Sequence, residues 1–331
     1  MKLLKKISFL ESANFSPWPN RLIGLSPWQK SERTTKEVLD EYNNVWYKNA
    51  LREWENYSNA HQSPSTARFF RVLDNIIYNQ MLQNFEIYGI SSDEHLISIN
   101  RELYTAKWSV ISALYDNFLI DILESYTNLY NIHTLVELGC GTGKNLFNAY
   151  SKLSINQIIG AEICPNAVEL GNKISNQCNI DGKFKIFDYF QPNDIYEITC
   201  EISDKYMIFT SHSIEQIEFE KTNFIEQILK LKHPPEVIIH FEPIFDATDS
   251  NFFHKLHHVY TQKNLYNSDL LNVLQKYETE GYIKIIDMQK DIFGLSAFNP
   301  RRCERFATLR AGYERSRLCH SRGCVKTSPR C

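Results

Sequence analysis

A glycine-rich turn between an apolar run and a helix-compatible segment constrains the fold of this chain more than any other feature. It has the sequence Val136-Glu137-Leu138-Gly139-Cys140-Gly141-Thr142-Gly143-Lys144-Asn145, an acidic residue followed by three alternate glycines. The residues before the turn have the pattern of a buried parallel strand, and residues 145–152 that of a helix. Glycines let a ligand approach the main chain, while the next helix presents free N–H groups. The turn therefore indicates a nucleotide-type pocket in an α/β protein.

The spacing of the glycines excludes two common phosphate-binding motifs. A dinucleotide fingerprint G-x-G-x-x-G that starts at Gly139 needs a glycine where Lys144 stands. A P-loop that ends at Gly143-Lys144 needs Ser or Thr where Asn145 stands. The remaining pattern, E-x-G-x-G-x-G, resembles the first motif of class I S-adenosylmethionine-dependent methyltransferases.

This resemblance extends over residues 134–300, and it implies S-adenosylmethionine as the cofactor. It also implies a Rossmann-like α/β sheet of seven strands with helices on both faces, which we expect in a domain at 127–300. The cofactor contacts that the resemblance and the strand ends indicate are Glu137, Gly139, Cys140, Gly141, Gly143, Asn145, Glu162, Ile163, Asp188, Tyr189, Thr210 and Ser211.

Two acids at strand ends carry the second part of this prediction. Glu162 ends an apolar run roughly 20 residues after the glycines, the interval at which a Rossmann-like site places a carboxylate on ribose hydroxyls. The resemblance implies that Asp188, after a third strand, meets the adenine amino group and that Tyr189 covers the ring. The alternatives are an ordinary acid in the first turn of a helix for Glu162 and a plain loop start for Tyr189.

The loops after strands 206–209 and 237–241 are expected to face the reacting methyl group, since ligands lie outside the carboxyl ends of parallel strands. Methyl transfer is an in-line displacement in which positioning supplies most of the catalysis, so no metal is required. A hydroxyl or protonated amine acceptor benefits from a base, and histidine is best matched to neutral pH. The catalytic candidates are His212 first, then Glu215, His240 and Glu242. A hydrogen-bonded loop position is the alternative for His212, and a buried core position is favoured for His240.

Residues 1–126 exceed what this fold needs, and we expect there an extended segment followed by a helical cap over the acceptor. Prolines alternate with tryptophans at 16–19 and 26–28, which suits an extended segment. Three helices are expected, at 35–54, 65–85 and 93–126. The alternative is that the tryptophans of this region only pack the core.

Residue usage changes abruptly after Pro300. Residues 301–331 hold eight arginines, against six in all the residues before them, and four of the eight cysteines. The family's sheet ends with a strand inserted antiparallel between the fifth and sixth strands, and residues 295–298 have only the beginning of such a strand. We therefore expect 301–331 to be a disordered tail and the last strand to be truncated, which would weaken the sheet.

Histidines and cysteines give no complete metal motif. His254 and His258 lie on one helical face but lack a third ligand, and Cys319-His320 with Cys324 lacks the four-ligand spacing. We therefore predict no metal.

The net charge of −3 argues against a nucleic-acid partner, and no apolar run approaches a membrane span. The apolar stretch in residues 1–10 is too short for a secretory core, so a cytoplasmic location is expected. The expected partner is a small-molecule or sugar-like acceptor methylated on O or N, and the sequence does not give the oligomeric state. The alternatives are a protein methyltransferase, an inactive S-adenosylmethionine-binding protein, and an aminopropyl transferase. The last resembles spermidine synthases and needs an Asp pair that Thr210-Ser211-His212 lacks.

Overall fold

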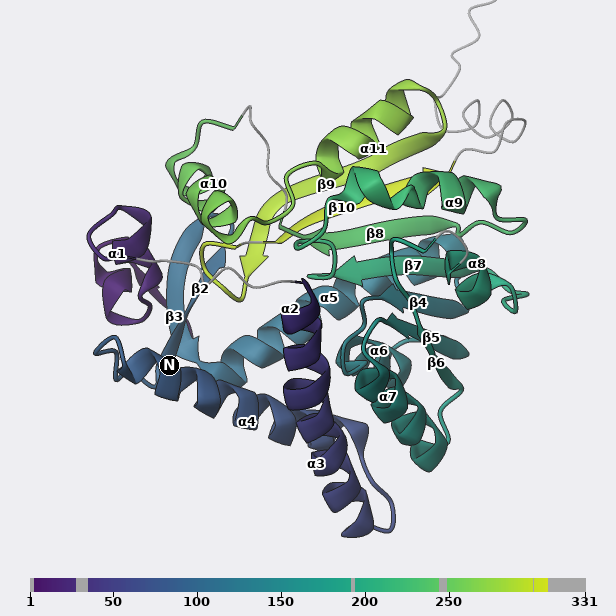
Figure 1. The fold of residues 1–331 in the computed structure, drawn as a ribbon, viewed down its shortest axis with the longest axis horizontal. Coiled ribbons are helices and arrows are strands. Elements are labelled where there is room, and N and C mark those ends of the chain that lie inside the picture. The colour runs from purple at the N-terminus through teal and green to yellow at the C-terminus, as the bar shows by residue number, and fades with distance from the viewer. Residues whose placement is uncertain (1–2, 28–34, 192–193, 244–248, 300, 309–331) are drawn as a thin grey trace, which may run out of the picture.

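The computed structural model describes residues 3–27, 35–191, 194–243, 249–299 and 301–308. Its strands form a single ten-stranded sheet in the order β1-β3-β2-β9-β10-β8-β7-β4-β5-β6 (Figure 1). Helices pack on both faces of this sheet, as the sequence predicts.

Five neighbouring strands of the sheet are parallel, and they coincide with strands that the sequence predicts. They are β4 (Thr134–Leu138), β5 (Gln157–Glu162), β6 (Gly182–Ile186), β7 (Tyr206–Ser211) and β8 (Val237–Glu242). Every residue of β4 and β8 is buried, as expected for parallel strands covered on both faces. The strand order reverses between β4 and β7, and at such a switch point the loops after the strands leave a crevice for a ligand.

Alternate side chains of each parallel strand enter two hydrophobic cores. Leu135 belongs to the core shared with the helices on one face, and Val136 belongs to the core on the other. The first group of helices is α3 (Lys48–Asn59), α4 (Thr66–Glu86), α5 (Trp108–Tyr130), α6 (Lys144–Lys152) and α7 (Pro165–Cys178). The second group is α8 (Asp194–Thr199), η3 (Phe219–Thr222), α9 (Phe224–Lys230) and α11 (Leu270–Thr279).

The last strand of the sheet is formed, which corrects the expectation of a truncated strand and of a disordered tail from residue 301. Strand β10 (Arg301–Thr308) lies between β8 and β9 (Ile283–Gly294) and is antiparallel to both. Its bounds are displaced from the prediction, because residues 295–298 lie in the turn after β9. Ladder hydrogen bonds join backbone groups of any residue type, so an arginine-rich segment can complete the sheet. The rest of the tail, with Cys319, His320 and Cys324, lies outside the described residues.

The N-terminal region extends the same sheet, which corrects the prediction that residues 1–126 hold only an extended segment and helices. The expected helix at 93–126 is instead a hairpin of β2 (Glu94–Ile99) and β3 (Glu102–Lys107), followed by α5. Asn100 and Arg101 form its turn with φ values of 49° and 68°, the positive angles that a two-residue hairpin turn requires. Strand β1 (Lys5–Ile7) pairs with β3 at the edge, and β2 pairs with β9 (Figure 1).

The remaining N-terminal elements are helical. They are η1 (Glu11–Asn14), α1 (Trp18–Leu22), α2 (Thr35–Glu41) and a π-helix, η2 (Tyr42–Tyr47), that continues into α3. Helix α1 corrects the extended segment predicted around Trp18, since Pro17 and Pro19 suit the first turn of a helix. Trp54 is fully buried, in agreement with a packing role. Helix α10 (Phe252–Asn264) lies near α1. No helix among the described residues is both long and apolar enough to cross a membrane.

Candidate functional site

The glycine turn lies between β4 and α6, and its conformation and close neighbours leave no room for side chains at two of its glycines. Gly139 and Gly143 have φ values of 68° and 76°, in the left-handed region. A Cβ on Gly139 would lie 2.2 Å from the Cβ of Ser213, and one on Gly143 would lie 2.7 Å from the ring of Phe184. The turn is anchored to the neighbouring strand, because the N–H groups of Gly139 and Cys140 both donate to the carbonyl of Ala161, at 2.7 and 3.1 Å. These contacts hold the main chain of the turn in one conformation.

Glu162, at the end of β5, lies directly against this turn. One carboxylate oxygen accepts a 2.9 Å hydrogen bond from the N–H of Gly141, and the other accepts one of 3.1 Å from the N–H of Cys164. Burial raises the pKa of Glu162, although these hydrogen bonds act in the opposite direction. The structure therefore brings Glu162 together with Gly141, and the half-buried Ile163 follows in the same loop.

Glu137 and Asn145 contact each other. The side-chain amide of Asn145 donates to Oε1 of Glu137 at 2.7 Å, which ties the first turn of α6 to the end of β4. Glu137 is 1% exposed, and burial raises its pKa to about 8. A neutral, buried carboxyl group in this place supports the turn from below.

Asp188 and Tyr189 follow β6 and point into different surroundings. Tyr189 is buried, and its hydroxyl lies 2.9 Å from the hydroxyl of Ser213 and 3.5 Å from the carbonyl of Leu138. Asp188 is half-buried and accepts a 2.9 Å hydrogen bond from the N–H of Phe190. Tyr189 therefore packs beneath the glycine turn, whereas Asp188 remains near the surface of the loop.

His212 begins the loop after β7 and forms a pair with Glu215. Its Nδ1 lies 2.7 Å from the Oε2 of Glu215, and its backbone has a φ of 55°. Burial lowers the pKa of His212, but the negative charges of Glu215 and Glu242 raise it by more, so the pKa lies above its ordinary value. A carboxylate at Nδ1 favours the tautomer with the proton there, which leaves Nε2 as the basic nitrogen. Glu215 is further held by the side-chain amide of Asn299, at 3.1 Å.

The other two catalytic candidates are fully buried at the end of β8. The carboxylate of Glu242 accepts hydrogen bonds from the N–H groups of Ser213, at 3.0 Å, and Ile214, at 3.3 Å, and burial raises its pKa to about 7. His240 lies 2.9 Å from the hydroxyl of Thr210, and burial lowers its pKa to about 3. His240 thus occupies the core position that the sequence favours, with Thr210 as its partner. Glu242 shapes the loop that carries His212.

The structure adds a residue that the sequence does not single out. Tyr47, in the π-helix η2, points its hydroxyl at the glycine turn, where it would lie 3.2 Å from a Cβ on Gly141. Burial, together with the nearby charge of Glu162, raises the pKa of Tyr47 well above its ordinary value. The same π-helix is held to the start of α7, because Asn43 accepts a 2.9 Å hydrogen bond from the N–H of Asn166. The sequence predicts a helix here, but a contact between residues so distant in the chain has no local signal.

A second contact from the N-terminal region reaches the end of β7. The hydroxyl of Tyr115, on α5, lies 3.2 Å from the hydroxyl of Ser211. Side chains of η2 lie against the turn after β4 and the start of α7, and a side chain of α5 contacts the end of β7. The candidate site lies where these elements meet.

Comparisons with known proteins concern the fold. No protein-family model matches the chain, and no curated protein sequence matches it. The methyltransferase domain of bacterial CtHen1-C is similar, with a TM-score of 0.41 and 13% identity over 58% of this chain and 97% of that one. Magnesium protoporphyrin IX methyltransferase (ChlM) from Synechocystis PCC 6803 with bound SAH has a TM-score of 0.42 and 12% identity, covering 60% of this chain and 85% of that one. The cyclase SpnF has a TM-score of 0.37 and 17% identity, with coverages of 53% and 58%.

Proposed function

We propose that this chain, whose sheet has the class I methyltransferase architecture, binds S-adenosylmethionine and transfers its methyl group to O or N of a small-molecule or sugar-like acceptor. The observation that carries the proposal is the hydrogen bond between Glu162 and the N–H of Gly141 at the carboxyl edge of parallel strands. It places a carboxylate and a bare main-chain turn next to each other, as recognition of a nucleoside requires.

The residues at this edge fit the parts of the cofactor. The main chain of the glycine turn would lie against the methionine part of the cofactor, and Glu162 would accept hydrogen bonds from the ribose hydroxyls. Asp188, near the surface after β6, would accept a hydrogen bond from the adenine amino group, and Ile163 would lie beside the adenine ring. Four of the predicted contact residues would support the site from beneath rather than touch the cofactor, because their described hydrogen-bond partners are groups of the protein itself. They are Glu137, Asn145, Tyr189 and Thr210.

When bound, S-adenosylmethionine supplies an electrophilic methyl group on a sulfonium. The chain's own part is to hold the acceptor in line with that methyl group and to take the acceptor's proton. We assign the proton to Nε2 of His212, while Glu215 at Nδ1 stabilises the imidazolium that forms. His240 is left out of this chemistry, because a group with a pKa of about 3 is a weak base and its side chain is fully buried.

The proposal is tested by calorimetric titration of the full chain with S-adenosylmethionine and S-adenosylhomocysteine, with NAD as a control. We expect saturable binding of both methionine-derived ligands and none of NAD. Replacing Gly141 by Leu should abolish binding, because the new side chain would meet the hydroxyl of Tyr47. Unchanged affinity in that variant would place the pocket elsewhere.

Measurements of turnover distinguish the proposed methyltransferase from an inactive S-adenosylmethionine-binding protein. A panel of hydroxyl and amine acceptors, monitored by release of S-adenosylhomocysteine, should reveal acceptor-dependent turnover. Cofactor binding without turnover on any acceptor, including proteins, would favour the inactive S-adenosylmethionine-binding protein.

A further inference from the structure

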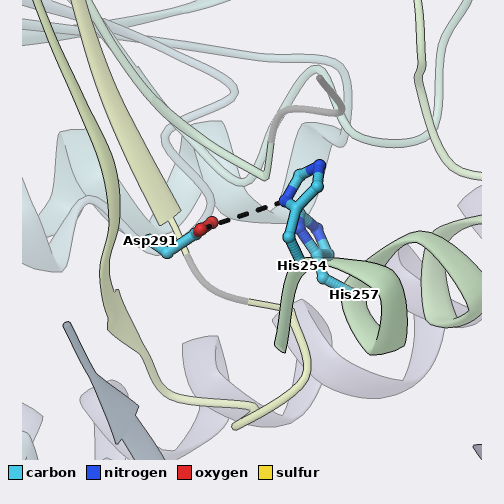
Figure 2. Close-up of side chains that lie close together, drawn as sticks. All are labelled: His254, His257 and Asp291. Carbon is cyan, nitrogen blue, oxygen red and sulfur yellow. Dashed lines mark ion pairs between the residues drawn. The ribbon is translucent and has the colours of Figure 1, made fainter. Parts of the chain in front are cut away.

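A cluster of two histidines and an aspartate lies apart from the residues described above. His254 and His257 come from α10 and Asp291 comes from β9, and Figure 2 shows the side chains turned toward one another. One ligand atom from each lies within 4.8 Å of the others, and Nδ1 of His254 is 3.9 Å from Oδ2 of Asp291. All three residues are buried, with exposed fractions of 0 to 1%. We propose that they bind a divalent transition-metal ion of the zinc class.

The donor set selects this class of ion. Imidazole nitrogens combined with a single carboxylate suit Zn²⁺ and its neighbours in the first transition row, whereas Mg²⁺ and Ca²⁺ prefer oxygen ligands throughout. Ligand atoms that lie about 2.0 to 2.2 Å from a tetrahedral zinc are roughly 3.3 to 3.6 Å apart. The observed separations are somewhat larger, and small rotations of the three side chains would close them around an ion. Three protein ligands leave a fourth position for water or another donor.

The backbone of β9 is irregular where it presents the aspartate. Asp291 has a φ of 52° within the strand. The pairing with β10 passes from Phe293 opposite Arg301 to Gln289 opposite Cys303, so β9 has two more residues than its partner in this interval. Such bulges turn a side chain away from its regular direction and occur near functional sites. The bulge accounts for how a strand residue meets histidines of a neighbouring helix.

Charged groups around the cluster balance an added cation. Nε of Arg101 donates to Oδ2 of Asp291 at 2.8 Å, and the same guanidinium pairs with Asp249. Asp249 in turn accepts a 3.0 Å hydrogen bond from the N–H of Asn251, which caps α10. With both imidazoles neutral, as metal ligands must be, the two carboxylates and one guanidinium leave a net negative charge that favours a cation. A carboxylate has two oxygens, so Asp291 can serve the guanidinium and a metal together.

A metal in this place would join three parts of the fold. Helix α10, strand β9 and the β2–β3 hairpin, through Arg101, all meet at the cluster. The loop that follows helix α10 reaches the candidate catalytic pair, because the N–H of Asn267 donates a 2.7 Å hydrogen bond to the carbonyl of Glu215. The ion would thus fix a helix that reaches toward the candidate catalytic pair. A network of histidine, aspartate and arginine that needs no ion is the competing explanation of the same contacts.

The test uses the full chain after dialysis against EDTA, titrated calorimetrically with Zn²⁺ and spectroscopically with Co²⁺. We expect one Zn²⁺ per chain at this site and a tetrahedral Co²⁺ spectrum without the sulfur charge-transfer band that cysteine ligation produces. His257→Gln and Asp291→Asn should each weaken Zn²⁺ binding by more than about 100-fold. His258→Gln, on the same helix but outside the cluster, is the matched control and should bind as the unaltered chain does.

Cysteine is also a zinc ligand, so a further variant tests whether the cysteines of the tail bind the ion. Replacing Cys319 and Cys324 by Ser should leave the proposed site intact. The proposal is overturned if the unaltered chain gives no tetrahedral Co²⁺ spectrum, if the ion is lost with these cysteines, or if Mg²⁺ binds in preference to Zn²⁺. It is also overturned if His257→Gln, folded by circular dichroism, retains full affinity. The Co²⁺ spectrum of the unaltered chain decides the matter even where a variant does not fold.

Discussion

The carboxylate of Glu162 accepts a hydrogen bond from the N–H of Gly141, although the two residues belong to different strand-to-helix connections. Neighbouring parallel strands bring them together, because the carboxyl ends of β4 and β5 lie at the same edge of the sheet. A ligand at this edge would meet the carboxylate and the glycine turn at once.

Replacing Glu162 by Gln should weaken S-adenosylmethionine binding by roughly 10- to 100-fold, since hydrogen bonds to a charged group contribute about 1.5 to 3 kcal/mol. Calorimetric titration measures the loss. Glu169→Gln is the matched control, because that side chain is 52% exposed on α7 and should leave affinity unchanged. Equal affinities in both variants would mean that Glu162 does not contact the ligand.

His212→Ala should lower kcat by roughly 10²- to 10⁴-fold with little change in cofactor affinity, if the histidine takes the acceptor's proton. The base acts in its neutral form, so activity should rise with pH through the raised pKa of His212. Glu215→Gln removes a charge that raises this pKa and should move the rise to lower pH. The pH profile of kcat/KM measures both effects. His133→Ala, before β4 at the opposite edge of the sheet, should behave as the unaltered chain.

Gly139→Ala should reduce the free energy of unfolding by about 2 to 4 kcal/mol, from the left-handed backbone and the clash with Ser213 together. Gly281 has a φ of 80° and no atom within 4 Å of an added Cβ. Gly281→Ala should therefore show only the backbone cost, about 1 to 2 kcal/mol. Urea denaturation compares the two variants. Equal losses would show that the close approach to Ser213 has no energetic effect.

Local patterns in the sequence were sufficient for the parallel half of the sheet. Apolar runs such as 135–138 and 237–241 have few alternatives to a buried strand, and glycines mark the turn after β4. The placement of Glu162 beside this turn also follows, because strand order in such sheets obeys a general rule.

Local sequence patterns do not predict contacts between segments that are distant in the chain. The hairpin at Asn100-Arg101 has no separate signal in the sequence, because α5 follows it directly and the helical pattern continues backward over it. Tyr47 meets Gly141, and Asp291 meets His257, only through the tertiary fold. Strand β10 has no alternating apolar pattern in the sequence. It is a strand because β8 and β9 pair with it.

Glu137→Gln should flatten the pH dependence of stability. The folded-state pKa of Glu137, about 8, lies above its unfolded value, so the folded chain binds the extra proton between these pH values. The free energy of unfolding should therefore fall as pH rises from about 5 to 8, with a slope of up to about 1.4 kcal/mol per pH unit from this group. Glutamine keeps the oxygen that Asn145 contacts but does not titrate. Urea denaturation at several pH values should give the shallower slope in the variant, with Glu242 contributing what remains; identical slopes would contradict the raised pKa of Glu137.

Glu304→Pro should destabilise the chain by about 3 kcal/mol or more, because proline removes an N–H from a strand paired on both sides. Glu304 lies opposite His240 on β8 and Met288 on β9, so the loss occurs within the sheet and next to the strand that carries Glu242. Glu304→Thr is the matched control, because threonine keeps the N–H and has a high strand propensity, and it should destabilise the chain less than proline does. Thermal unfolding of the two variants separates a backbone role from a side-chain role. If proline is tolerated as well as threonine, residues 301–308 do not form the ladder between β8 and β9, as expected for the truncated last strand that the sequence predicts.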